Sequence, residues 1–309
     1  MSRAISEYVQ QYNSYSSCLK RRFGKPVAKI PVNGGFSCPN RDGTLSHSGC
    51  AFCDNNAFSP VAKATTNLSD QVFSAINRLQ RRYSAFIVYA QPFSNTYGTV
   101  ERLSAVYEPL VRINGVVGVS IGTRPDCFTE DIYAYLAGLS KRTFLTVELG
   151  LQSSHDATLR AINRGHEFGA FVSTVKRLAD LGVETVAHVI LGLPGESIAM
   201  MFETADRLAA LPLQGIKFHQ LMVVKGTAME RMHAEGGVIP FSIEEYAPIV
   251  CGCIERLRPD QCIHRIMADM RAGIGLIAPS WSADKPGSIR YLHAYMETHR
   301  VEQGKCRVL

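Results

Sequence analysis

Residues 183–224, VETVAHVILGLPGESIAMMFETADRLAALPLQGIKFHQLMVV, contain the pattern that decides the expected fold. The nearly continuous apolar run at 183–193 is typical of a strand that is buried on both faces. Ser197, a residue type favoured at helix N-caps, precedes an amphipathic stretch, and a second strand-like run follows at 215–224. A strand, a helix and a further strand in this order indicate a parallel sheet covered by helices.

The same alternation recurs along most of the chain. Helical stretches such as 69–83 separate the strand-like runs, and Ser69 and Thr129 are the expected N-caps of two helices. Right-handed crossovers curl such units into a barrel, so we expect an α/β fold, a partial (β/α)6 barrel. The six predicted strands lie at 28–32, 85–90, 116–122, 143–151, 183–193 and 215–224.

We expect three segments in the chain. Residues 1–26 form a basic N-terminal segment, 27–226 form the barrel, and 227–309 form a small C-terminal α/β extension packed on the barrel. Within this extension, the amphipathic stretch at 242–257 predicts one helix, and another is expected near 286–302.

The composition is typical of a globular protein. The 309 residues are 46% apolar and 19% charged, and no apolar run reaches the roughly 18 residues that span a bilayer. The N-terminal stretch MSRAISEYVQQYNSYSS lacks the apolar core of a signal peptide, so we expect a cytoplasmic protein. The net charge of +6 is concentrated near the N-terminus, a pattern compatible with a phosphate backbone as partner or with a solvated surface. The cations there are Arg3, Lys20, Arg21, Arg22, Lys25 and Lys29, against Glu7 alone.

A polar loop after the first predicted strand carries three of the nine cysteines, in the sequence CPNRDGTLSHSGCAFCDNNAF at 38–58. Cys50 and Cys53 form a Cys-x-x-Cys pair whose sulfurs can face one metal centre, and Cys38 returns to them through a glycine-containing loop. Three thiolates suit a [4Fe-4S] cluster with one open iron. His47 would complete a Cys3His zinc site, and cysteines without a ligand are a third possibility.

The other predicted strands also end in glycine or turn residues mixed with polar groups. Ligands of parallel α/β folds bind at the carboxyl ends of the strands, so the cysteine loop and these turns should line one pocket. The turns are QPFSNTYG at 91–98, GTRPDC at 122–127, ELGLQSS at 148–154, GLPGES at 192–197 and VVKGT at 223–227.

These motifs resemble those of the radical S-adenosylmethionine (SAM) superfamily. The stretches VELGLQSSHDATLRAINRGH, GTRPD and KGT are similar to stretches of the Elongator catalytic subunit, and SCPNRDGT, IGTRPDC and IHRI resemble the bacterial YhcC-like family of Elongator-related proteins. The resemblance covers roughly residues 25–281. Two departures are a chain too short for the Elongator acetyltransferase domain and Gly122 in place of the glutamate before Thr123.

The resemblance implies an enzyme in which Cys38, Cys50 and Cys53 bind a [4Fe-4S] cluster that cleaves SAM reductively to a 5'-deoxyadenosyl radical. It implies an electron donor such as a flavodoxin or a ferredoxin. The residues expected to bind the cofactor are Phe52, Ser94, Asn95, Thr123, Glu148, Gln152, Gly192 and Lys225, and those expected to act in catalysis are Arg124, Arg164 and His166. Packing, turn formation and helix capping are the alternative roles of these side chains.

The substrate implied by the resemblance is a tRNA wobble uridine. The expected reaction converts its carboxymethylaminomethyl group to an aminomethyl group. Two alternatives stay open at this point: a radical SAM enzyme that acts on a small metabolite, and a zinc-stabilised RNA-binding module without catalysis.

Overall fold

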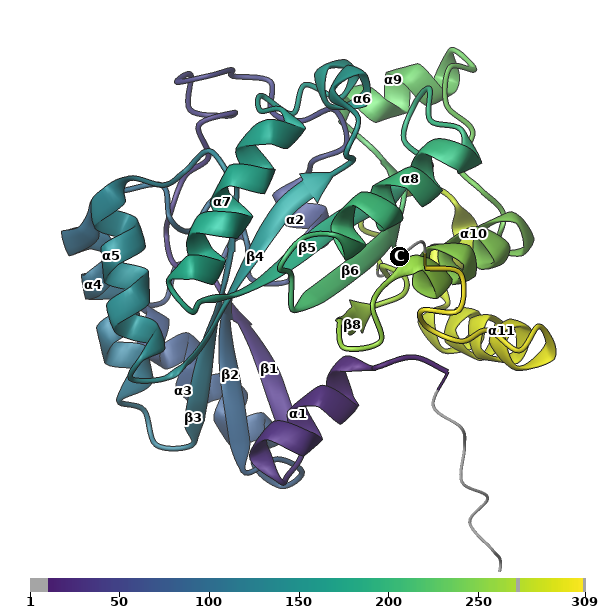
Figure 1. Ribbon diagram of the computed structural model, residues 1–309. Helices are drawn as coiled ribbons and strands as arrows, with labels where there is room; N and C mark the ends of the chain where they lie inside the picture. Colours follow the sequence, from purple (N-terminus) through teal and green to yellow (C-terminus); the bar gives the residue numbers. More distant parts are fainter. Residues whose placement is uncertain (1–10, 271–272, 308–309) are drawn as a thin grey trace, which may run out of the picture.

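A curled sheet of parallel strands forms the centre of the molecule (Figure 1). The computed structural model describes residues 11–270 and 273–307. The strand order is β1-β2-β3-β4-β5-β6-β8, so neighbours in the sheet follow each other in sequence, and all these pairs are parallel. The strands are β1 Val27–Val32, β2 Ala85–Ala90, β3 Val116–Thr123, β4 Phe144–Gln152, β5 Glu184–Leu191, β6 Gly215–Gln220 and β8 Cys262–Arg265. The predicted partial barrel is therefore confirmed, with a seventh strand that the sequence did not predict.

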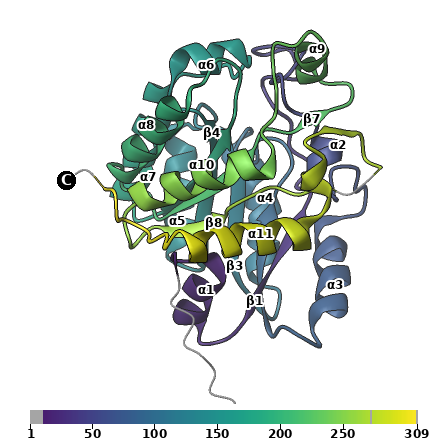
Figure 2. The same ribbon diagram turned by 90° about the vertical axis from the view of Figure 1, so that its right-hand side faces the viewer.

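Helices cover the outer face of this sheet (Figures 1 and 2). α3, α4, α5 and α7 pack directly on the strands from this side. Over the described residues, the helices are α1 Tyr15–Phe23, α2 Asn55–Phe58, α3 Leu68–Leu79, α4 Val100–Val111, α5 Glu130–Ser140, α6 Asp156–Ala161, α7 Phe168–Asp180, α8 Ile198–Ala209, α9 Ala228–Ala234, α10 Ile243–Arg256 and α11 Lys285–Thr298, with a 3-10 turn at Ser280–Ala283. In the described part of the chain, no helix combines the length and the apolar character needed to cross a membrane.

The helix starts follow local capping chemistry. Thr129 and Ser197 cap α5 and α8 as predicted, each accepting a hydrogen bond from a backbone N–H in the first turn. The predicted cap Ser69 is wrong, because α3 begins earlier, at Leu68. Asn67 is its cap, and its side-chain oxygen accepts from the N–H of Asp70 at 2.9 Å.

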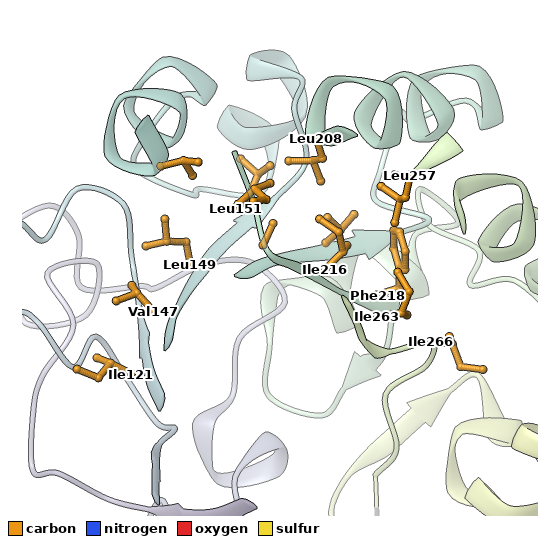
Figure 3. Close-up of a cluster of buried hydrophobic side chains, with 14 of the residues drawn as sticks. Ile121, Val147, Leu149, Leu151, Leu208, Ile216, Phe218, Leu257, Ile263 and Ile266 are labelled. Carbon is orange, nitrogen blue, oxygen red and sulfur yellow. The ribbon is translucent and has the colours of Figure 1, made fainter. Parts of the chain in front are cut away.

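The main core lies between the sheet and the outer helices, as Figure 3 shows. In β4, Val147, Leu149 and Leu151 belong to this core, while Glu148 and Gln152 line a cavity inside the curled sheet. Side chains alternate between the two faces of a strand, so the apolar residues fill one face and the polar residues occupy the other. The inner face of β4 is therefore polar at these two positions.

The C-terminal segment completes the sheet as well as packing on it. β8 pairs with β6, and α10 packs against α8 of the barrel and against α11 (Figure 2). The predicted helices at 242–257 and 286–302 correspond to α10 and α11. A short antiparallel ribbon, β7 (Val223–Val224) with β9 (Leu276–Ala278), joins the sixth β/α unit to the segment that follows.

Candidate active site

A cavity opens at the carboxyl ends of the strands, where the sequence predicts a pocket. Strands β2, β3, β4, β5, β6 and β8 contribute residues to its lining, and the loop between β1 and α2 closes one side. Of the predicted site residues, the cavity wall contains Cys38, Cys50, Phe52, Cys53, Ser94, Thr123, Arg124, Glu148, Gln152 and Arg164. Asn95, His166, Gly192 and Lys225 are not part of the wall.

The cysteine loop is held across the barrel by backbone contacts. The N–H of Ala51 donates to the carbonyl of Ile162 at 2.9 Å, and the carbonyl of Ala51 accepts from Met229 at 2.9 Å. A tight turn brings the N–H of Cys53 to 3.0 Å from the carbonyl of Cys50. These contacts bring the three thiols of the loop to one cavity, although eleven residues separate the first two in the sequence.

Cys50 lies in an electropositive environment. Arg164 Nη1 donates to its Sγ at 3.3 Å, and Asn40 Nδ2 does so at 3.4 Å. Burial disfavours the thiolate, but the charges of Arg164 and Arg124 outweigh burial and lower the pKa of Cys50. Burial and the neighbouring Cys50 raise the pKa of Cys53 to about 11. Arginine stays charged at any physiological pH, so this environment stabilises sulfur with negative charge.

The Cys3His alternative does not match this geometry. His47 is exposed, and its ring lies against Gly43 instead of lining the cavity. Over residues 11–270 and 273–307, no three His, Cys, Asp or Glu side chains converge closely enough to hold a single metal ion. A [4Fe-4S] cluster is bound at separate irons, so its thiolates surround a larger volume than the ligands of one ion do.

Several buried polar atoms near the thiols have no partner among the residues that the structure describes. These atoms are Arg124 Nη1, Arg164 Nε, Ser94 Oγ and Asn40 Oδ1. A buried donor without an acceptor costs about 1–3 kcal/mol, so unpaired groups on a cavity wall indicate a ligand that pairs with them. Three thiols with free arginine donors beside them fit an anionic iron-sulfur group and its ligand.

Arg124 and Arg164 are positioned by different contacts. Arg124 makes a bidentate pair with Asp126, with N···O distances of 2.9 and 2.7 Å. Arg164 donates to the carbonyl of Gly150, which also contacts His166 Nε2 at 3.3 Å. Burial and the charge of Arg164 lower the pKa of His166 to about 3, so its imidazole is neutral. His166 thus lies behind the wall, where it contacts the same carbonyl as Arg164.

The remaining predicted cofactor residues fall into distinct environments. Asn95 is buried and donates to three backbone carbonyls, at 2.8, 2.9 and 3.1 Å, so its amide supports the turn after β2. The Thr123 hydroxyl pairs with Thr96 at 2.7 Å. Gly192 packs against the ring of Phe241, and Lys225 is exposed. Gln152 lines the cavity with a φ of 85°, a left-handed conformation that is rare for residues other than glycine.

Glu148 lies deeper in the barrel than its predicted role requires. Its carboxylate pairs with Lys29 and with Lys217 (3.1 Å), and it accepts from His188 at 2.7 Å. The hydroxyl of Ser120 donates to it at 2.7 Å. Burial opposes the charge, but Lys217, Lys29 and His188 outweigh burial and hold the pKa of Glu148 well below its ordinary value.

We call the charged and imidazole side chains around Glu148 the floor of the cavity, and sequence reasoning missed its members His188, Lys217, His219 and Arg265. Lys217 and His219 alternate with Ile216 and Phe218 in β6, and His188 occupies an inner position of β5. Polar residues at every second position of an otherwise apolar strand were the signal that could have identified them. Arg265 is the last residue of the unpredicted strand β8, which is too short to show such an alternation of polar and apolar residues.

The described part of the basic N-terminal segment, residues 11–26, lies at the opposite end of the barrel. α1 packs on β1 and β8, and Arg21 and Arg22 border a second cavity together with the first residues of β4 and β5. Lys29 is directed into the barrel, where it pairs with Glu148 and so is not part of a basic surface. Arg3 lies outside the described residues.

Two family models match consecutive parts of the chain. The model described as the radical SAM superfamily matches residues 38–208, and the radical SAM C-terminal domain matches residues 213–298. YtqA of Bacillus subtilis is 38% identical over 96% of this chain and 92% of its own length, and YhcC of Escherichia coli is 34% identical over 94% of both.

More distant similarities extend to Elongator-related proteins. A protein of Methanocaldococcus infernus named tRNA uridine(34) acetyltransferase is 30% identical over 48% of this chain and 29% of its own length. The solved structure of an archaeal Elp3 from the same species has a TM-score of 0.64 at 17% identity, covering 90% of this chain and 64% of that one. At this identity, the structural similarity establishes a shared fold.

Proposed function

The chain belongs to the radical SAM superfamily, whose enzymes use a [4Fe-4S] cluster and SAM, and from this premise we propose that Cys38, Cys50 and Cys53 bind the cluster. When bound, the cluster supplies the electron that cleaves SAM to methionine and a 5'-deoxyadenosyl radical. The observation that carries the proposal is the convergence of these thiols, with unpaired arginine donors beside them, on one cavity. Membership in an enzyme superfamily also removes the alternative of a non-catalytic zinc module.

We call the part of the cavity wall beside Cys38, Cys50 and Cys53 the rim, and its residues have separate tasks. Arg164 and Asn40 donate to the sulfur of Cys50 and stabilise its negative charge. The unpaired Nη1 of Arg124 and the Oγ of Ser94 would bind SAM, together with the other cavity-lining residues Phe52, Thr123 and Gln152. His166 positions Arg164 through the carbonyl of Gly150 that both contact. Asn95, Gly192 and Lys225 support the surrounding loops.

The substrate that we propose is a tRNA wobble uridine that carries a carboxymethylaminomethyl group. The bond between its amine nitrogen and the carboxymethyl carbon breaks, so the aminomethyl group stays on the base and the carboxymethyl part leaves as a two-carbon acid. The proposal is supported by the Methanocaldococcus infernus relative, whose name specifies uridine 34 of tRNA. The reaction requires a reducing partner such as a flavodoxin or a ferredoxin. A small metabolite is the competing substrate.

Nucleoside analysis tests this substrate. The reconstituted enzyme, kept anaerobic with SAM and a reductant, should convert the wobble nucleoside of a tRNA that carries the carboxymethylaminomethyl group. It should release 5'-deoxyadenosine faster with this tRNA than with an unmodified transcript. Equal release with both RNAs and an unchanged nucleoside would leave the metabolite as the substrate.

The basic helix α1 provides a separate test of RNA binding. Lys20, Arg21 and Arg22 lie in its last turn, at the amino ends of the strands, so they can contact only a part of the tRNA distant from the cavity. Replacing these residues and Lys25 by glutamine should flatten the salt dependence of tRNA binding. An unchanged salt dependence would show that the RNA binds another face.

A further inference from the structure

Four strands contribute charged or imidazole side chains to the floor of the cavity. Glu148 comes from β4, His188 from β5, Lys217 and His219 from β6, and Arg265 from β8. Lys29 of β1 reaches the same place, and its ammonium lies 4.2 Å from the ring centre of Tyr89. The floor therefore joins both edges of the curled sheet.

Positive charge exceeds negative charge in this group. Lys29, Lys217 and Arg265 are opposed by the single carboxylate of Glu148. Asp269 also borders the cavity, but it is paired with Lys285 at 2.9 Å. Burial lowers the pKa of Lys217 to about 7, and the positive charges of Arg265 and Lys29 act in the same direction against Glu148. A closed core avoids such an excess, because desolvated charges are costly unless they are paired.

Two groups on this wall have no partner within the described ranges. The guanidinium of Arg265 makes no hydrogen bond to, and no ion pair with, any described residue, although its positive charge acts on Lys217 and His219. His219 Nε2 is buried and also lacks a partner there. An arginine fork and an imidazole that face one cavity form a site for a planar anion.

The floor is separate from the rim that holds the thiols. Glu148 precedes Gln152, at the end of β4, by four residues, which corresponds to about 13 Å along the strand. Lys217, His219 and Arg265 belong to β6 and β8, at the edge of the sheet opposite to β1 and to the cysteine loop that follows it. A ligand held at the rim therefore leaves the floor available to a second molecule. The floor lies inside the curled sheet, so a carboxylate at the tip of a substrate side arm fits it better than a phosphodiester within an RNA chain does.

We propose that Arg265, Lys217 and His219 bind a carboxylate at the end of the substrate's side arm and thereby orient the atoms next to it toward the rim. This inference rests on the proposed radical SAM function of the cavity. One further carboxylate would bring the floor close to charge balance, with two carboxylates facing three cations. The floor then selects substrates that carry this group.

The first test uses the reconstituted enzyme and an anticodon stem-loop RNA with 5-carboxymethylaminomethyluridine, compared with the same RNA bearing the carboxamide. The wild type should prefer the acid by at least about tenfold in kcat/KM, because the carboxamide cannot form a charged pair with Arg265. Arg265→Gln should lose this preference and keep its cluster content and SAM affinity. Arg265→Lys should keep part of the preference, and the exposed control Arg112→Gln should keep all of it.

A second test does not depend on the identity of the substrate. Sodium acetate should raise the midpoint of thermal unfolding of the wild type more than sodium chloride does at equal ionic strength, since a ligand stabilises the state that it binds. Arg265→Gln should abolish the difference. Acetate without this effect on the wild type, or an equal effect on Arg265→Gln, would overturn the subsite. A clear acetate effect without RNA turnover would instead overturn the tRNA substrate and leave the subsite standing.

Discussion

The rim and the floor of the cavity are both electropositive, but they use different cations. At the rim, Arg124 and Arg164 lie beside the thiols, and arginine does not lose its proton in proteins. At the floor, Lys217 has a pKa of about 7 and shares Glu148 with Lys29. The positive charge of the rim therefore stays constant over the physiological pH range, which suits a resident cluster. The charge of the floor changes with pH and with the ligand that binds there.

The largest expected effect is the loss of cluster binding at the rim. Cys50→Ala removes one of three proposed protein ligands and the sulfur to which Arg164 and Asn40 donate, so the reconstituted protein should lose its stable cluster and all SAM cleavage. Iron and sulfide analysis with electron paramagnetic resonance measures this loss. Cys251→Ala, a buried cysteine of α10, is the matched control and should retain the cluster. Four irons retained in Cys50→Ala would contradict the assignment.

The second effect is a loss of stability when the carboxylate of the floor is removed. Glu148→Gln leaves the buried Lys217 and the half-buried Lys29 without their carboxylate, which should cost about 3–5 kcal/mol in the free energy of unfolding. Denaturant titration measures the change. Glu130→Gln removes the carboxylate of an exposed pair with Arg177 and should change the stability little. Equal effects of the two variants would show that the floor is solvated like the surface.

A smaller effect concerns SAM binding at the rim and should not involve the residues of the floor. Gln152→Ala should weaken SAM binding by about 1–3 kcal/mol while the cluster stays intact, because one side-chain contact to the ligand is lost. Calorimetry on the reconstituted protein measures the affinity. Gln80→Ala, at the exposed end of α3, should have no effect. An unchanged affinity in Gln152→Ala would assign this residue to the turn after β4.

The smallest expected effect is a pH dependence of the free energy of unfolding that comes from Lys217 of the floor. Between about pH 7 and 10, unfolded Lys217 keeps its proton while folded Lys217 has lost it, so the unfolded state binds more protons and stability rises with pH. The slope due to this group is at most about 1.4 kcal/mol per pH unit. The groups that face Lys217 are Glu148, Lys29, Tyr89, His188, His219 and Arg265.

Urea titrations of the wild type and Lys217→Met at pH 7, 8 and 9 measure this slope. The wild type should gain more stability than the variant over this range, because the variant has no proton to lose at this position. Parallel slopes would show that Lys217 keeps an ordinary pKa in the folded protein.

Local sequence patterns were sufficient to predict the strands and most helix caps of the barrel. The apolar runs of β2 and β5, and the caps Thr129 and Ser197, depend on neighbours within a few residues, so the sequence contains their signal. The position of the cysteine loop follows equally from the strand before it, because the carboxyl end of a parallel strand is where ligands bind. The cap of α3 was misplaced because Asn67 and Ser69 both have side chains suited to capping.

The sequence by itself thus determined the order of the β/α units, the place of the three thiols and the family. Only the tertiary structure decided which polar residues meet inside the barrel. β8 has four residues, and it joins the sheet because packing of the C-terminal segment brings it beside β6. Glu148, Lys29 and Arg265 are far apart in the chain, and curvature of the sheet brings them to one floor. The period of apolar and polar residues in a strand predicts which face of the sheet a side chain occupies. Which side chain it contacts there depends on how the sheet curls and brings distant strands together.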